Sequence, residues 1–226
     1  MTRRGQVIAI VGAESTGKSM LATALAARVV EATGLACVAV GEVLREWCER
    51  EGRTPRIDEQ REIAVEQQHR IDAAAAMHDV VVADTTPLMT AVYSQLLFDD
   101  PSLLPMAVAA HQQAALTLLT ALDLPWVPDG LQRDGAHVRV PVDHAVRALL
   151  GQHGLAWSVV GGHGAARLEQ AFDAATPLLA SLAPAHAGLF TRLAARETAM
   201  PVWRWVCDTC DVPDCEHAIM RSLQCR

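Results

Sequence analysis

The stretch GAESTGKS, residues 12–19, constrains the fold more than any other part of this 226-residue sequence. It follows the short apolar run QVIAIV at 6–11 and precedes apolar residues at four-residue spacing: Leu21, Leu25 and Val29. A continuous Val/Ile-rich run is typical of a strand buried on both faces, and four-residue spacing predicts an amphipathic helix. The sequence therefore predicts a strand, a glycine-rich loop and a helix in direct succession.

The loop fills the pattern G-x-x-x-x-G-K-S/T of a nucleoside triphosphate-binding P-loop. Glycines allow backbone angles that turn N–H groups inward around an anion, and the helix N-terminus adds its positive dipole end. Lys18 is expected to reach the β- and γ-phosphates of ATP, and the Ser19 hydroxyl to ligate Mg²⁺. A glycine-rich turn without a ligand is the alternative. The predicted ATP contacts are Gly12, Ala13, Glu14, Ser15, Thr16, Gly17, Lys18, Ser19 and Met20.

The rest of the sequence alternates between strand and helix patterns. Further strands are predicted at 35–40, 79–84, 115–122 and 156–161, although 115–122 also fits a helix. Helices are expected at 41–51, 58–78 with Asp58 as N-cap, 87–97, 105–115, 143–153 and 165–182. Within 58–78, Glu66 and Arg70 are expected to pair, and Gln67 and His69 to lie on a polar face. This alternation predicts the three-layer α/β fold of P-loop NTPases, with a parallel five-stranded sheet and helices on both faces.

Composition indicates the organisation and the class of partner. A kinase or ATPase domain is predicted at 1–183, with a small lid at about 123–142 around the Pro- and Gly-containing stretch DLPWVPDGLQRDG. Residues 184–226 are expected to form a helical segment and a Cys-rich tail. The net charge of −7 argues against nucleic acid as a partner. Since no signal-peptide or membrane-span pattern is present, we expect a cytoplasmic protein without a membrane partner.

Asp84 ends the third predicted strand, where a P-loop protein usually carries the carboxylate that supports its Mg²⁺. A strand-end turn or a cap for the helix that begins near Pro87 is the alternative. No Asn-Lys-x-Asp element and no Leu-Ser-Gly-Gly-Gln stretch occurs, which disfavours a GTPase and a transporter ATPase.

Several stretches together resemble one group of P-loop proteins. In order along the chain they are GAESTGKS, the E-x-x-R-E of 42–46, EQQHRIDAA, VVVADTT and LPWVPDGLQRDG. Their combination resembles the nicotinamide riboside kinase domain of NadR-type proteins and the broader group of NadR-like P-loop ATPases. The resemblance spans about residues 6–175, and its loop motif is shared by many families, whereas PWVPDGLQR is much more specific.

The resemblance implies ATP- and Mg²⁺-dependent phosphoryl transfer to the 5′-hydroxyl of nicotinamide riboside. Glu42 is then a base or substrate ligand, Arg45 a substrate or phosphate ligand, Trp126 a stacking partner of the ring, and Arg133 the lid arginine. Each of these residues also has a purely structural alternative. Glu42 can cap a helix, and Arg45 can pair with Glu49 on the surface. Trp126 can be a core anchor and Arg133 a solvated loop residue.

One departure from the family concerns the end of the third strand. The family often has Asp-Thr-Asp there, and this chain has Asp84-Thr85-Thr86, so a second carboxylate is missing. The resemblance still places Asp84 near Mg²⁺ or the acceptor hydroxyl. A nucleoside-like acceptor is expected; a slow regulatory ATPase and a nucleotide-sensing module without turnover are the alternatives.

The tail sequence CDTCDVPDCEH has the residue types of a metal site. A Cys-x-x-Cys turn can hold one edge of a Zn²⁺ tetrahedron, which two further ligands would close. Idle reduced thiols, an iron–sulfur cluster and a redox switch are the alternatives. The candidate zinc ligands are Cys207, Cys210, Cys215 and His217, with Cys225 as a substitute.

Overall fold

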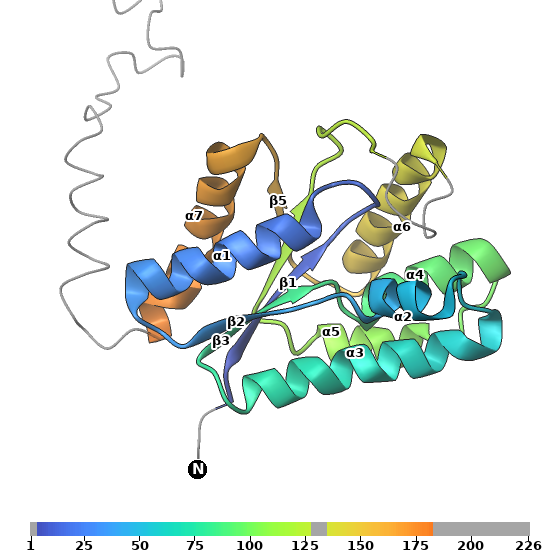
Figure 1. The fold of residues 1–226 in the computed structure, drawn as a ribbon, viewed down its shortest axis with the longest axis horizontal. Coiled ribbons are helices and arrows are strands. Elements are labelled where there is room, and N and C mark those ends of the chain that lie inside the picture. The colour runs from blue at the N-terminus through green and yellow to red at the C-terminus, as the bar shows by residue number, and fades with distance from the viewer. Residues whose placement is uncertain (1–3, 128–134, 183–226) are drawn as a thin grey trace, which may run out of the picture. The chain divides into compact units, whose positions relative to one another are not determined.

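A five-stranded parallel sheet forms the centre of the protein (Figure 1). The computed structural model describes residues 4–127 and 135–182. The strands lie in the order β2-β3-β1-β4-β5, and every neighbouring pair is parallel. Their bounds are β1 Gln6–Val11, β2 Cys37–Val40, β3 Val80–Asp84, β4 Leu116–Thr120 and β5 Ser158–Val160. The predicted parallel five-stranded sheet is confirmed, and β4 shows that the ambiguous run at 115–122 is a strand.

Helices cover both faces of this sheet, as predicted (Figure 1). Helices α1 (Lys18–Thr33) and α7 (Gly164–Leu182) lie on one face. The opposite face carries α3 (Gln60–Ala75), α4 (Pro87–Phe98), α5 (Leu104–His111) and α6 (Arg139–Gln152). The short α2 (Val43–Glu51) and the 3-10 turns η1 (Ile57–Glu59) and η3 (Ala136–Val138) complete the described elements.

The central strand β1 is buried on both sides because both faces of the sheet are covered. Val7 packs in a cluster with β3 and α3, and Val11 in a second cluster with α4 and α6. Ile8 and Ile10, which alternate with them along the strand, are fully buried as well. This two-sided burial is the reason for a continuous apolar run instead of alternation.

Two helix starts differ from the predictions. Asp58 is not the cap of α3: the Glu59 carboxylate accepts the Arg56 N–H at 2.8 Å and binds the Arg53 guanidinium at 2.7 and 2.8 Å. The chain therefore enters α3 through η1. Helix α6 begins at Arg139, four residues before the predicted 143. Helix α1 ends at Gly34, a glycine in the left-handed conformation at φ 72°.

Part of the predicted organisation lies outside the described residues. This applies to the centre of the predicted lid, including Arg133, and to the whole segment 184–226 with its zinc candidates Cys207, Cys210, Cys215 and His217. The domain boundary and the zinc site stay predictions, and metal analysis of the purified protein would test the zinc site. Among the helices that are described, none is long and apolar enough to cross a bilayer.

Candidate nucleotide-binding site

The P-loop connects the end of β1 to the start of α1 and adopts backbone angles that the sequence explains. Gly12 and Gly17 have positive φ values of 145° and 76°. A Cβ on Gly12 would also lie 2.2 Å from the Thr120 Oγ1, so a side chain is excluded there twice over. Ser15 has φ 55°, and its hydroxyl donates to the Val127 carbonyl and accepts the Val127 N–H, both at 2.9 Å. The loop is thereby tied to the segment that follows β4.

Lys18 lies at the N-terminus of α1 and points into the loop. Its side chain is buried, with 8% of the residue exposed, and Nζ donates to the Ala13 carbonyl at 2.8 Å. Burial lowers the pKa of Lys18, and the carboxylates of Glu42 and Asp84 oppose that shift. Lys18 is also the only lysine in the chain. The ammonium is thus held where the motif requires it, between the loop and two acids.

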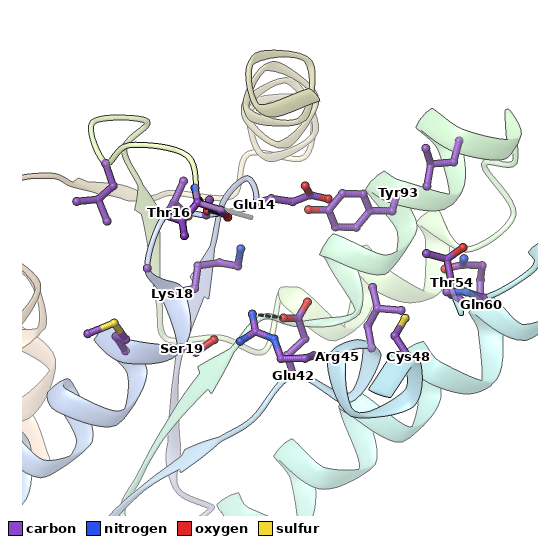
Figure 2. Close-up of a pocket in the computed structure, with 18 of the residues that line it drawn as sticks. Glu14, Thr16, Lys18, Ser19, Glu42, Arg45, Cys48, Thr54, Gln60 and Tyr93 are labelled. Atoms are coloured by element: carbon purple, nitrogen blue, oxygen red, sulfur yellow. Dashed lines mark hydrogen bonds and ion pairs between the residues drawn. The ribbon is translucent and has the colours of Figure 1, made fainter. Parts of the chain in front are cut away.

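A cavity of about 690 Å³ opens beside the loop (Figure 2). Its first part, the phosphate end, is lined by residues 14–20 of the P-loop and the start of α1. Its second part, the uncharged end, is lined by side chains without formal charge: Leu44, Cys48, Thr54, Pro55, Gln60, Tyr93, Leu97 and Phe98. Leu124, Pro125 and Val127 complete the lining. One cavity therefore joins a phosphate cup to a mostly apolar compartment.

Glu42 and Arg45 lie between the two ends (Figure 2). Arg45 Nη2 donates to Glu42 Oε2 at 3.2 Å. Burial raises the pKa of Glu42, and the nearby Lys18 ammonium counteracts the rise. Neither structural alternative is found, since Glu42 makes no side-chain cap for α2 and Arg45 pairs with Glu42 and not with Glu49. Both side chains are available to a ligand in the cavity.

Asp84 ends β3 next to the P-loop strand, in register with Ile10. Only 4% of the residue is exposed, and its Oδ1 has no hydrogen-bond partner among the described residues. Asp84 does not cap α4, because the Thr86 hydroxyl accepts the Leu88 N–H instead. A buried carboxylate oxygen without a partner is suited to a cation, although no cluster of three or more metal-ligating side chains occurs in the described part of the chain.

Thr86, the residue at which the resemblance implied a second carboxylate, belongs to the core. Its hydroxyl pairs with His111 Nδ1 at 2.9 Å, and His111 Nε2 pairs with the Thr117 hydroxyl at 2.9 Å. Burial lowers the pKa of His111 to about 4, which keeps the ring neutral. A threonine at 86 is thus explained by packing, and any carboxylate that acts on an acceptor must come from elsewhere.

Trp126 differs from its neighbours in its relation to the cavity. Pro125 and Val127 line the cavity, and the half-buried Trp126 between them does not. Its indole Nε1 is buried without a hydrogen-bond partner in the described ranges. The aromatic side chains that do line the uncharged end are Tyr93 and Phe98, which sequence reasoning did not single out.

Gln67 is a second residue that sequence reasoning missed. It was expected on a polar face with His69, and the exposed His69 does lie there. Gln67, in contrast, is buried: its Oε1 accepts the Val43 N–H at 2.8 Å and its Nε2 donates to the Gly41 carbonyl at 3.1 Å. It thereby fixes the start of α2 and the position of Glu42. No motif marks this role, because a buried glutamine and an exposed one look alike in sequence.

Comparisons with known proteins agree with this architecture. A family model described as an AAA domain matches residues 7–167, which is most of the chain. The chain belongs to this AAA domain family. A search of curated proteins gave no match.

Several solved structures share the fold of this AAA domain protein. A structure titled NadR protein in complex with NAD and AMP-PNP has a TM-score of 0.61 and 20% identity, and covers 78% of this chain and 50% of its own. A NadR complex with NR has a TM-score of 0.61 and 18% identity, with coverages of 76% and 50%. Thymidylate kinase from Ehrlichia chaffeensis has a TM-score of 0.55 and 12% identity, with coverages of 78% and 100%.

These comparisons confirm the resemblance to NadR-like P-loop proteins that the sequence indicated. At such identities they show the fold alone, and this chain spans about half the length of the NadR chains that it matches.

Proposed function

We propose that this protein is an ATP-dependent kinase that transfers the γ-phosphoryl group of ATP to the hydroxyl of a nucleoside-type acceptor. One observation carries the proposal: a single cavity of about 690 Å³ leads from the P-loop, past Glu42 and Arg45, into an uncharged compartment. A plain ATPase needs only the first part of such a cavity. The second part has the room and the lining for a second substrate.

At the phosphate end, the chain's own groups bind and orient ATP. The phosphate oxygens would replace the Ala13 carbonyl as acceptor of the Lys18 ammonium, and the loop N–H groups would surround them. Ser19 and Asp84 are the residues proposed to hold Mg²⁺, which fits the partnerless Oδ1 of Asp84. A magnesium ion held there would neutralise charge on the transferred group.

Between the two ends, Glu42 is the proposed base. Its carboxylate is held by Arg45 and lies near Lys18, where the γ-phosphate and the acceptor hydroxyl would meet. Thr86 is not an alternative base, because its hydroxyl is hydrogen-bonded to His111 in the core. Arg45 is proposed to hold a phosphate or substrate oxygen, and Arg133 to act from the lid as the sequence predicts.

At the uncharged end, the lining suits a flat base with one or two polar groups. Tyr93 and Phe98 offer ring surfaces, and Thr54 and Gln60 offer hydrogen-bonding groups. A nicotinamide ring is a flat cation, which an aromatic face attracts. We therefore propose nicotinamide riboside as the first acceptor to test, with Tyr93 in the stacking role first assigned to Trp126. The likeness to the NadR complex with NR supports this choice.

The decisive experiment measures ADP formation by the purified chain with Mg²⁺-ATP and different acceptors. The set contains nicotinamide riboside, the common nucleosides, thymidine monophosphate and a sample without acceptor. Riboside-dependent ADP and mononucleotide are the expected result. ADP without any acceptor would favour the regulatory ATPase, ATP binding without ADP the sensor, and turnover of the monophosphate alone a nucleotide kinase. Lys18→Ala is the negative control throughout.

A further inference from the structure

Arg167, in the first turn of α7, is a buried arginine to which the proposed chemistry assigns no role. Only 5% of the residue is exposed, and it does not line the cavity. Its Nη2 donates to the Thr16 carbonyl of the P-loop at 2.7 Å. Its Nη1 donates to Asp123 Oδ1 at 2.9 Å and to the Gly162 carbonyl at 3.1 Å. One guanidinium thus joins the P-loop to two loops at the carboxyl edge of the sheet.

Asp123, three residues after β4, holds this guanidinium in place. Its second oxygen, Oδ2, accepts the Gly162 N–H at 2.5 Å. Partial burial acts to raise the pKa of Asp123, but the hydrogen bonds from Arg167 and Gly162 outweigh it, and the pKa lies below its ordinary value. The carboxylate is therefore ionised at neutral pH and fixed at both oxygens, which fixes the arginine that it pairs with.

The bond to the Thr16 carbonyl has a consequence on the other side of the same peptide unit. In a trans peptide, the C=O and the following N–H point in opposite directions. Arg167 holds the carbonyl of Thr16, so the N–H of Gly17 points away from Arg167. Gly17 lines the phosphate end of the cavity, and its N–H has no acceptor among the described residues.

The rest of Thr16 is fixed as well, so this peptide has little freedom. The Thr16 hydroxyl bonds the Ala13 carbonyl at 2.8 Å and the Thr120 hydroxyl at 2.7 Å. The Thr120 hydroxyl also lies 3.3 Å from the Val11 carbonyl. Side chain and carbonyl of Thr16 are thus held by different partners, of which only Arg167 carries a charge.

We propose that Arg167, held by Asp123, is a positioning residue that orients the Gly17 N–H toward the phosphates of a bound nucleotide. An N–H that is already aligned costs no reorganisation when the anion arrives, which strengthens binding. The proposal concerns the phosphate cup and is independent of the phosphoryl acceptor. Absence of kinase turnover would count against the proposed function and leave this inference intact.

The test compares Arg167→Met with Arg28→Met, which changes a matched arginine. Arg28 also joins α1 to α7, through Glu169 at 3.0 Å and the Phe172 ring at 4.5 Å, but none of its contacts is with the P-loop backbone. Calorimetry measures binding of ATP, GTP and inorganic tripolyphosphate to the full-length variants. Because a hydrogen bond from a charged group is lost, Arg167→Met should weaken all three ligands by about tenfold, and Arg28→Met by less than about twofold.

The pattern across the three ligands distinguishes positioning from other roles. Equal losses for ATP, GTP and tripolyphosphate support the proposal, since only the phosphate cup is common to them. A loss for ATP alone would assign Arg167 to the base, and affinities within twofold of wild type in a folded Arg167→Met variant would show a purely structural role; either result overturns the proposal.

Two further variants keep the test valid if Arg167→Met fails to fold. Asp123→Asn leaves the guanidinium in place but removes its ionic anchor, and should weaken tripolyphosphate by about threefold. Arg167→Lys should recover only part of the affinity, because one ammonium does not reproduce the fork that binds Thr16, Asp123 and Gly162 together. Wild-type tripolyphosphate affinity in Asp123→Asn would overturn the proposal.

Discussion

The two ends of the cavity are built in different ways. The phosphate end comes from seven consecutive residues, 14–20, and its binding groups are backbone N–H groups with one ammonium and one hydroxyl. The uncharged end comes from side chains of α2, the connection to η1, the start of α3, and α4, which are far apart in the sequence. The first end is therefore specified locally, and the second only by the way in which the helices pack.

The two ends also differ in how completely they are fixed before a ligand arrives. The P-loop is held from several sides, by Thr120, Arg167 and Val127. At the uncharged end, Leu97 and Phe98 are exposed, and the buried Gln60 has an Oε1 without a partner among the described residues. This difference suggests that phosphate binding is preorganised and that the acceptor contributes to the final arrangement of its own compartment.

The largest expected effect concerns the phosphate end. Lys18→Ala removes the ammonium that would neutralise the β- and γ-phosphates, so ATP-dependent turnover should fall by about 10³-fold or more. ADP formation at saturating acceptor measures this. Because the acceptor compartment is separate, riboside binding to the variant should stay within about twofold of wild type in calorimetry. A Lys18→Ala variant with ordinary turnover would contradict the assignment of the loop.

The same lysine provides an independent control on the wild-type protein. It is the only lysine, so peptide mass spectrometry after treatment with an amine-specific reagent reports on this one side chain. Burial lowers its pKa in the free protein, so modification should already proceed at a pH at which an ordinary lysine is protonated. ATP should protect it, and modification that is unaffected by ATP would contradict the proposed contact.

The second effect concerns the junction between the two ends. Glu42→Gln removes the proposed base and should lower kcat by about 10²-fold, with little change in the KM for ATP. Burial raises the pKa of Glu42, and a base acts only when ionised. The rate of the wild-type enzyme should therefore rise with pH through a pKa above the ordinary value, and Glu42→Gln should lose this rise. An unchanged pH profile would assign Glu42 to substrate binding alone.

The difference between the two ends also explains which parts of the fold and of the site could be predicted from the sequence. The P-loop, the parallel sheet and the strand-end position of Asp84 follow from local patterns, and the structure confirms them. The uncharged end could not be predicted, because Tyr93, Gln60 and Phe98 belong to no motif and meet only through helix packing. Gln67 was predicted to be a surface residue for the same reason.

Other differences arise where two local patterns compete. Asp58 and Glu59 are both plausible near a helix start, and the arginines at 53 and 56, which bind Glu59, decide between them. Arg167 carried no signal in the sequence, because its partners Thr16, Asp123 and Gly162 come together only in the folded sheet. Long-range hydrogen bonds to backbone carbonyls leave no pattern of residue types.

A smaller effect is expected in the uncharged end. Tyr93→Ala removes one of the two aromatic rings that line this compartment, the one proposed to stack on the acceptor, and should raise the KM for the acceptor by about tenfold, since stacking on a base contributes about 1–3 kcal/mol. The KM for ATP should not change. Trp126→Ala is the matched control, because Trp126 does not line the cavity. If Trp126→Ala raises the acceptor KM more than Tyr93→Ala does, the stacking role returns to Trp126.

The smallest effect is expected at Gln60, where one substitution should stabilise the protein and weaken its use of the acceptor. Gln60 is 3% exposed, and its Oε1 has no partner among the described residues. Replacing a buried acceptor without a partner by an apolar group of similar size should raise the free energy of unfolding, so Gln60→Met should gain about 1 kcal/mol in urea denaturation. The same change should raise the acceptor KM a few-fold, because the amide would no longer be available to the ligand.

Gln67→Met is the control for this pair of measurements. Gln67 is equally buried, but both ends of its amide are bonded, to the Val43 N–H and the Gly41 carbonyl. Its replacement leaves these two backbone groups without partners and should cost about 1–3 kcal/mol of stability. If Gln60→Met and Gln67→Met destabilise alike, then Gln60 has a structural partner, and the uncharged end is as completely fixed without a ligand as the P-loop is.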